Sequence, residues 1–245
     1  MQKTILATDL DGTFLGGSPA QRTALYDWIQ ARRDEIVLIY ASGRSLTAMQ
    51  DVLDELPLQP DHIIANVGTS VYTGPQFLPL TAVEAWLDAA WDTDARERIQ
   101  VILQDHLHLS PQTVIEGRRV SCFYTDEALA HTVRDLIMAM GFDVLLSDEK
   151  YFDVLPRGVQ KGPTLLKTLE ALGLAPERTL VAGDTLNDLS LFQTGLAGVA
   201  VANREPLLTQ ALAGMTNVHQ SELEGAGGVL EALQRFHQFT SGEKK

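Results

Sequence analysis

Cysteine is almost absent from the sequence. Cys122 is the single cysteine among 245 residues, so the chain cannot form an internal disulfide. It lies in an apolar run with no Lys or His beside it to activate the thiol. The sequence therefore predicts a packed core thiol in a protein of a reducing compartment.

Long apolar runs are also missing. No segment approaches the ~20 consecutive apolar residues that a membrane helix needs. The N-terminus has no basic stretch followed by an apolar core and a cleavage site, the pattern of a secretory signal. We therefore expect a cytoplasmic protein with no membrane partner.

Basic residues are outnumbered by acidic ones. The chain has 19 Lys and Arg against 32 Asp and Glu, which gives a formal net charge of −13. Binding to a nucleic-acid backbone depends on clustered positive charge, so no nucleic-acid partner is expected. The acidic surface and small size permit a monomer. A phosphate ester could bind such a chain only where a cation compensates the local negative charge.

Hydrophobic patterning divides the chain into alternating elements. In the first third, strands are expected at residues 4–10, 36–41 and 62–67, separated by helices at 18–33 and 45–56. The last third repeats the alternation, with helix, strand, helix and strand expected at 163–172, 179–182, 186–193 and 197–201. Such alternation predicts an α/β fold in which helices cover both faces of a parallel sheet.

The middle of the chain follows a different order. Two helical runs are followed by a strand, a helix and two further strands between residues 81 and 156. This order is typical of an α+β domain inserted into an α/β one. We therefore expect a Rossmann-like, doubly wound parallel sheet core formed by residues 1–80 and 157–245, with an inserted α+β domain at 81–156.

Two aspartates stand at the exit of the first expected strand, in the segment Asp9-Leu10-Asp11-Gly12-Thr13. Both carboxylates can converge on one ligand where the backbone bends away. Carboxylates held this close repel each other and need a cation. Asp and Gly also favour turns, so this segment alone is equally well explained as a turn.

Two phosphate-binding features follow the aspartates. Ser42 and Gly43 come after the second strand, where a small hydroxyl and a glycine let the backbone approach a phosphate oxygen. Lys161 opens an expected helix, so its ammonium and the helix N-terminus can face the same anion. Taken alone, the first segment would be a simple turn and the lysine a solvated surface residue.

A cluster of oxygen ligands follows a strand of the last third. Asp184, Asn187 and Asp188 lie within five residues, and such groups suit Mg2+. A helix cap would explain some of these residues but not all three. Because the carboxyl ends of parallel strands meet at one edge of a sheet, we expect this cluster to lie beside Asp9.

The motifs DLDGT, SGR, KG and GDTLND, in this order, resemble the four signature motifs of the haloacid dehalogenase superfamily. The insertion between the second and third motifs resembles the type-two (C2B, Cof-like) cap, a mobile lid over the site. The resemblance implies a phosphatase whose nucleophile is Asp9 and whose acid and base is Asp11. It implies a Mg2+ site at Asp9, Asp11, Asp184 and Asp188. It implies phosphate binding by Asp9, Ser42, Gly43, Lys161 and Asn187.

Further segments resemble the sucrose-phosphate phosphatase group. They are NVGTSVY at 66–72, DVLPR at 153–157, VAVAN at 199–203 and GAGGVLEAL at 225–233. The cap segment RVSCFYTD at 119–126 resembles the group's Lys-Val-Ser strand, with Arg119 in place of the lysine. The implied substrate is a sugar phosphate, with sucrose 6-phosphate first among the candidates.

Seven residues are expected near the sugar: Gly68, Thr69, Ser70, Arg118, Arg119, Ser121 and Tyr124. Side chains alternate along a strand, so about half of the cap residues must point away from the substrate. A broad-specificity Cof-like enzyme and a phosphatase for mannosyl-3-phosphoglycerate, mannosylfructose phosphate or glucosylglycerol phosphate are the alternative enzymes. A sugar-phosphate-binding sensor is the alternative without catalysis.

Overall fold

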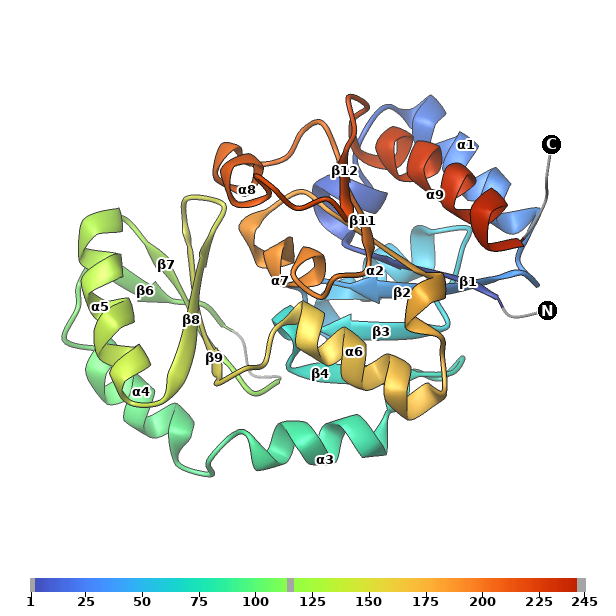
Figure 1. Ribbon diagram of the computed structural model, residues 1–245. Coiled ribbons are helices and arrows are strands. Elements are labelled where there is room, and N and C mark those ends of the chain that lie inside the picture. Colours follow the sequence, from blue (N-terminus) through green and yellow to red (C-terminus); the bar gives the residue numbers. More distant parts are fainter. Residues whose placement is uncertain (1–2, 114–116, 242–245) are drawn as a thin grey trace.

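The computed structural model describes residues 3–113 and 117–241. Within these residues the strands form one eight-stranded sheet and one four-stranded sheet. Figure 1 shows the smaller sheet with its helices standing to one side of the larger layered body. None of the helices in this part of the chain is long and apolar enough to cross a membrane.

The larger sheet has the order β12-β11-β10-β1-β2-β3-β4-β5. Its parallel strands are β1 (Thr4–Thr8), β2 (Ile36–Ala41), β3 (His62–Ala65), β10 (Thr179–Gly183), β11 (Ala197–Ala200) and β12 (Val218–Gln220). The antiparallel strands β4 (Ser70–Thr73) and β5 (Leu78–Pro79) extend it at one edge. The chain winds outward from β1 through β2 and β3 and later returns on the other side of β1. The predicted doubly wound α/β fold is confirmed.

Helices cover both faces of this sheet. One face carries α1 (Pro19–Gln30), α2 (Leu46–Glu55) and α9 (Gly225–Ser241), and the other carries α3 (Thr81–Ala89), α6 (Lys161–Leu172), α7 (Leu189–Phe192) and α8 (Pro206–Ala211). An apolar core lies on each face of the sheet, and alternate side chains of β1 point into one or the other. Leu6 packs against the helices of the first face, and Ile5 and Ala7 pack against those of the second. Strands buried on both faces explain the nearly continuous apolar runs in the sequence.

The smaller sheet lies within the inserted segment. It has the order β6-β7-β9-β8, with β6 (Leu109–Pro111), β7 (Val120–Tyr124), β8 (Phe142–Ser147) and β9 (Tyr151–Pro156). Helices α4 (Ala95–Leu103) and α5 (Glu127–Ala139) pack on one face of it. Cys122 lies in this core as predicted, and burial raises the pKa of its thiol to about 11. We call this sheet and its two helices the cap.

Helix α3 does not pack in the cap core. Val83 and Leu87 contribute instead to the apolar layer between α6 and the larger sheet. The sequence pattern assigns residues 81–89 to the inserted domain, whereas their buried apolar side chains pack with the larger sheet. The domain boundaries between residues 80 and 81 and between residues 156 and 157 stay predictions.

Two expected strands are shorter in the structure, for a local backbone reason. The strand expected at 62–67 ends at Ala65, because Asn66 and Val67 take left-handed conformations with φ of 54° and 59°. The strand expected at 4–10 ends at Thr8, because Leu10–Phe14 forms a helical turn, in which Gly12 has a φ of 78°. Both turns lie at the sheet edge where the site residues were expected.

The packing of α6 gives a testable prediction. Leu169 is fully buried, whereas Leu166 on the same helix is 39% exposed. We expect Leu169→Ala to lower the free energy of unfolding by about 2–5 kcal/mol, because it leaves a cavity against the sheet. The matched control, Leu166→Ala, should lower it by about 0.5 kcal/mol or less. Urea denaturation measures both values, and equal losses would contradict the assigned packing.

Candidate active site

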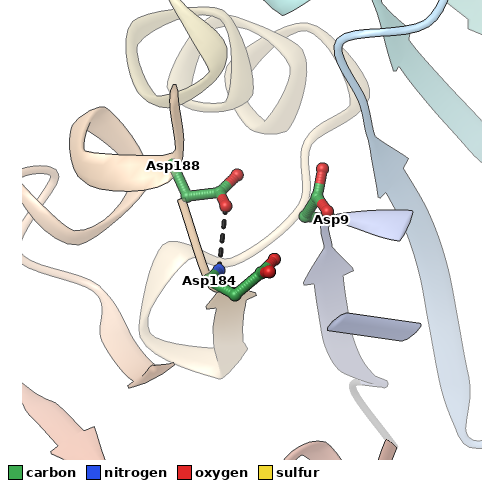
Figure 2. Close-up of side chains that lie close together, drawn as sticks. All are labelled: Asp9, Asp184 and Asp188. Atoms are coloured by element: carbon green, nitrogen blue, oxygen red, sulfur yellow. Dashed lines mark hydrogen bonds between the residues drawn. The ribbon is translucent and has the colours of Figure 1, made fainter. Parts of the chain in front are cut away.

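The site lies at the carboxyl ends of β1 and β10, which are neighbours on either side of the point where the winding reverses. Asp9 follows β1, and its N–H donates to the Ala182 carbonyl across 2.9 Å. Asp184 follows β10, and Asp188 comes one short turn later. Figure 2 shows the three carboxylates close together, and one oxygen of each lies within 4.8 Å of the others. The predicted convergence of the first and fourth motifs is therefore present.

Lys161 holds this cluster together. Its side chain is fully buried, and its Nζ donates to Asp9 Oδ1 at 2.7 Å, Asp188 Oδ1 at 2.7 Å and Asn187 Oδ1 at 2.6 Å. These three bonds use all the donors of an ammonium group. The alternative of a solvated surface lysine is wrong.

The loop after β10 is fixed by its own carboxylates. Asp188 Oδ2 accepts from the N–H groups of Asp184 at 2.9 Å and Thr185 at 3.0 Å, and Figure 2 shows the first of these bonds. The Thr13 hydroxyl donates to Asp184 Oδ1 at 2.6 Å. A Cβ on Gly12 would lie 2.1 Å from Asp184 Oδ2, so only glycine allows this approach.

Burial shapes the electrostatics of the cluster. Burial raises the pKa of Asp9 to about 7, and the charge of Asp188 adds to this effect while Lys161 opposes it. Burial and the charges of Asp188 and Asp9 raise the pKa of Asp184 to about 8. Burial would lower the pKa of Lys161, but the charges of Asp188 and Asp9 outweigh it and raise that pKa. One ammonium thus faces three carboxylates, and negative charge is in excess.

This trio of buried aspartates could hold a metal ion. Hard oxygen donors and uncompensated negative charge are what a divalent cation such as Mg2+ requires. Both oxygens of Asp188 already accept hydrogen bonds from the protein. Both oxygens of Asp184 also accept, from Thr13 at 2.6 Å and from Asn203 at 3.4 Å. Among the described residues, no hydrogen bond engages Asp9 Oδ2, so Asp9 has the carboxylate oxygen best placed to bind a cation directly.

Asp11 stands apart from the buried cluster. Its side chain is 56% exposed and forms a paired contact with Arg44, with Nε to Oδ2 at 2.8 Å and the terminal nitrogen to Oδ1 at 2.7 Å. Asp9, Asp11, Gly43 and Arg44 line one cavity of about 890 Å³. Ser42 lies beneath its surface, where its Oγ accepts from the Arg44 N–H at 3.1 Å.

The cap supplies the opposite wall of the cavity. Gln112, Arg119, Tyr151 and Asp153 line it. Arg119 and Asp153 are both buried and lie 3.4 Å apart, and the Ser121 hydroxyl donates to Asp153. Within the described chain, the buried Arg119 Nε has no hydrogen-bond partner. Of the predicted substrate residues, the structure therefore brings Arg119 to the cavity wall and places Ser121 behind it, in contact with Asp153.

The other predicted substrate residues lie elsewhere. Arg118 pairs with Glu84 at 2.9 Å and Asp88 at 2.6 Å, and it donates to the Thr69 carbonyl at 2.9 Å. Tyr124 packs against the cap core. Of the described residues that line the cavity, none is Gly68, Thr69, Ser70, Arg118, Ser121 or Tyr124. Direct contact of any of the seven with a substrate stays a prediction.

Asn203 and Arg44 are site residues that the sequence reasoning did not select. Asn203 Nδ2 donates to the Gly12 carbonyl at 3.0 Å and lies 3.4 Å from Asp184 Oδ2. Both residues come just after strands of the parallel sheet, β11 and β2, so the rule that strand ends converge could have identified them. The cap residues Gln112 and Tyr151 carry no such signal in the sequence.

Several known proteins resemble this chain in sequence. A profile of the sucrose-6F-phosphate phosphohydrolase family matches residues 2–237. A glucosylglycerol-phosphate synthase of Pseudomonas anguilliseptica is 40% identical over 95% of this chain, which spans 30% of that relative's length. A probable sucrose-phosphatase of Arabidopsis thaliana is 30% identical over 95% of the chain, which spans 59% of that protein.

Two further proteins match along their whole lengths. A mannosylfructose-phosphate phosphatase of Agrobacterium fabrum is 30% identical, over 95% of this chain and 96% of its own. The X-ray structure of a sucrose-phosphatase from Synechocystis, in complex with sucrose and phosphate, superimposes with a TM-score of 0.87 at 26% identity, over 96% of this chain and 98% of that one. With a family profile matching nearly from end to end, the chain belongs to the sucrose-6F-phosphate phosphohydrolase family, a branch of the haloacid dehalogenase superfamily.

Proposed function

We propose that the chain is a Mg2+-dependent phosphatase that hydrolyses a sugar phosphate monoester. The observation that supports this proposal most strongly is the position of the Asp9 carboxylate. Lys161 holds one of its carboxylate oxygens, and the residue lines a cavity large enough for a disaccharide phosphate. A carboxylate oriented in this way is suited to attack phosphorus.

In the first step an Asp9 oxygen forms a bond to phosphorus, the bond from phosphorus to the sugar oxygen breaks, and Asp11, protonated and released from its pair with Arg44, gives its proton to the leaving sugar. In the second step water attacks the aspartyl-phosphate, Asp11 takes the water proton, and the bond from phosphorus to Asp9 breaks. Asp11 is exposed toward the cavity, so it can meet both the leaving oxygen and water. Ser42, Gly43, Lys161 and Asn187 are the proposed phosphoryl-binding groups, and Lys161 would exchange one of its three present acceptors for a phosphoryl oxygen.

Asp9, Asp184, Asp188 and the backbone of Asp11 are the proposed Mg2+ ligands. The donor set fits, because buried carboxylates with raised pKa values lack a counter-charge. When bound, Mg2+ would offset negative charge on the phosphoryl group and on these carboxylates. The ion would also explain how an anionic ester approaches a chain with a net charge of −13.

The cap wall supports a largely neutral sugar as the leaving group. Arg119 and Asp153 compensate each other's charge, and Ser121 completes a hydrogen-bonding group of three. Such a group suits sugar hydroxyls, which both donate and accept. Sucrose 6-phosphate is the first proposed substrate. A glucosylglycerol phosphate is the second, because the 40% identical relative is named for synthesis of that ester.

Removal of the nucleophile tests the chemistry. We expect Asp9→Asn to reduce Mg2+-dependent phosphate release from p-nitrophenyl phosphate by about 10⁴-fold or more, because no covalent intermediate can form. Exposed Asp51→Asn, on α2, is the charge-matched control and should retain activity. Wild-type turnover in the Asp9 variant would exclude this mechanism.

A panel of esters tests the substrate. We expect sucrose 6-phosphate or glucosylglycerol phosphate to exceed glucose 6-phosphate in kcat/KM by about 10-fold or more, because the second unit can reach the cap wall. Phosphate release measures the rates. If simple hexose phosphates and nucleotides were hydrolysed faster, the proposal would give way to a broad-specificity Cof-like enzyme.

Mg2+ should stabilise the protein more at high pH. The pKa values of Asp9 and Asp184 are raised from 3.8 to about 7 and about 8, so between about pH 4 and pH 8 the folded chain binds more protons than the unfolded chain. Without Mg2+, the contribution of these two groups to the free energy of unfolding therefore falls as the pH rises. Over the same range their carboxylates lose the protons that compete with Mg2+.

The measurement is thermal unfolding with and without Mg2+. At one fixed concentration, about 100 times its dissociation constant at pH 8, Mg2+ should raise the Tm by about 5–10 °C at pH 8 and by less at pH 6, where it binds more weakly. Asp184→Asn should abolish most of the shift. An equal shift at both pH values, or an unchanged one in the variant, would argue against the assigned ligands.

A further inference from the structure

Glu205 contacts the loop after β10, which carries Asp184 and Asp188 and which we call the catalytic loop, at two points. Its backbone N–H donates to the Asp184 carbonyl at 2.8 Å, and its Oε2 accepts from the Leu186 N–H at 2.8 Å. Asp188 takes the two preceding N–H groups, those of Asp184 and Thr185. Three consecutive amides of the loop are thus held by two carboxylates, and Glu205 supplies the second.

The other oxygen of Glu205 reaches the cap. Oε1 accepts from the Asp148 N–H at 2.8 Å, at the tip of the hairpin formed by β8 and β9. Figure 1 shows this hairpin extending toward α8, which begins just after Glu205. One side chain therefore joins the tip of the cap directly to the loop that carries Asp184.

The hairpin tip is a tight turn. Asp148 and Glu149 both have φ of 51°, and the Lys150 N–H donates to the Ser147 carbonyl at 3.2 Å. Positive φ at both central residues is what the favoured tight hairpin turn requires, so the tip has a defined backbone that presents the Asp148 N–H. The Asp148 carboxylate is compensated by Lys150 at 2.5 Å, so its charge does not prevent the approach of Glu205. Ser147, Asp148 and Tyr151 all line the cavity.

The far side of the cap is fastened differently. Arg118 donates from its N–H to Thr69 Oγ1 at 3.3 Å and from its guanidinium to the Thr69 carbonyl at 2.9 Å, near the connection between cap and core. The bond between Glu205 and Asp148 lies instead at the tip of the hairpin formed by β8 and β9. Residues of this tip form part of the cavity wall. A bond at this position can respond to what the cavity holds.

We infer that Glu205 is a positioning residue that latches the cap tip to the catalytic loop when the cavity is covered. The inference rests on the proposed function for its role in turnover. The latch sets the position of Asp184 and the position of the cap wall together, because one rigid carboxylate serves both. Glu205 lies outside the four signature motifs and outside the buried trio of aspartates.

The test compares Glu205→Gln with a control, Glu149→Gln. The control removes one negative charge from an exposed residue next to Asp148, in the turn between β8 and β9. In the substituted side chain of Glu205→Gln, an NH2 group replaces one acceptor and must face one of the two N–H donors. We expect amide hydrogen exchange at Asp148 or Leu186 to become about 10-fold faster in Glu205→Gln. Neither amide should change in the control.

Kinetics separate a latch from a merely structural role. We expect KM for the best sugar phosphate to rise about 10-fold in Glu205→Gln while kcat changes less than about threefold, because the competent covered state is less populated. A structural role would instead lower kcat and Tm at unchanged KM. Glu205→Asp is a second variant: its shorter side chain should keep protection at Leu186, lose it at Asp148, and raise KM similarly.

Unchanged exchange at both amides in Glu205→Gln, or kinetic constants equal to those of Glu149→Gln, would overturn the latch. Failure of the proposed function is a distinct result. If the wild-type chain hydrolysed no phosphate ester, the proposed activity would fail, whereas faster exchange in Glu205→Gln would still support the contact between cap tip and loop.

Discussion

A buried ammonium group organises this protein. Lys161 is removed from water, which is tolerable only because Asp9, Asp188 and Asn187 satisfy all of its donors. These partners come from distant parts of the sequence. The first strand, the sixth helix and the loop after β10 must therefore all be in place before the lysine is satisfied. The same contacts fix one oxygen of Asp9 and leave the other directed at ligands.

The parallel sheet supplies the geometry for this arrangement. Because β1 and β10 are adjacent and parallel, their carboxyl ends bring Asp9 and Asp184 together without long side chains. Glycines then allow unusually close packing, as at Gly12 against Asp184. Three carboxylates thus meet one ammonium, and this buried trio could hold a metal ion.

The cap contributes groups of a different character. Its wall carries a compensated pair, Arg119 and Asp153, whereas the core carries uncompensated carboxylates. The proposed phosphoryl chemistry thus uses the charged groups of the core, and the proposed recognition of sugar hydroxyls uses the neutralised pair of the cap. Glu205 links the two halves, since its carboxylate bonds to the catalytic loop and to the hairpin tip at once.

The sequence by itself determined the α/β class, the approximate positions of most strands and helices, and the residues of the acidic site. Period-two and period-3.6 patterns and strand-end motifs are local signals, so they can be recognised without coordinates. It did not predict the short strands β4, β5, β6 and β12, because two to four residues carry too little pattern, and it did not predict the helices α8 and α9.

Only the tertiary structure decided which side chains are buried together. It buried Lys161 completely among its three acceptors and paired Asp11 with Arg44. It placed Arg118 in ion pairs away from the cavity. It also brought Asn203 and Glu205 beside Asp184. These outcomes depend on contacts between residues far apart in the chain. Burial and pairing of charges arise only when separate strands and helices meet, and no local pattern records that meeting.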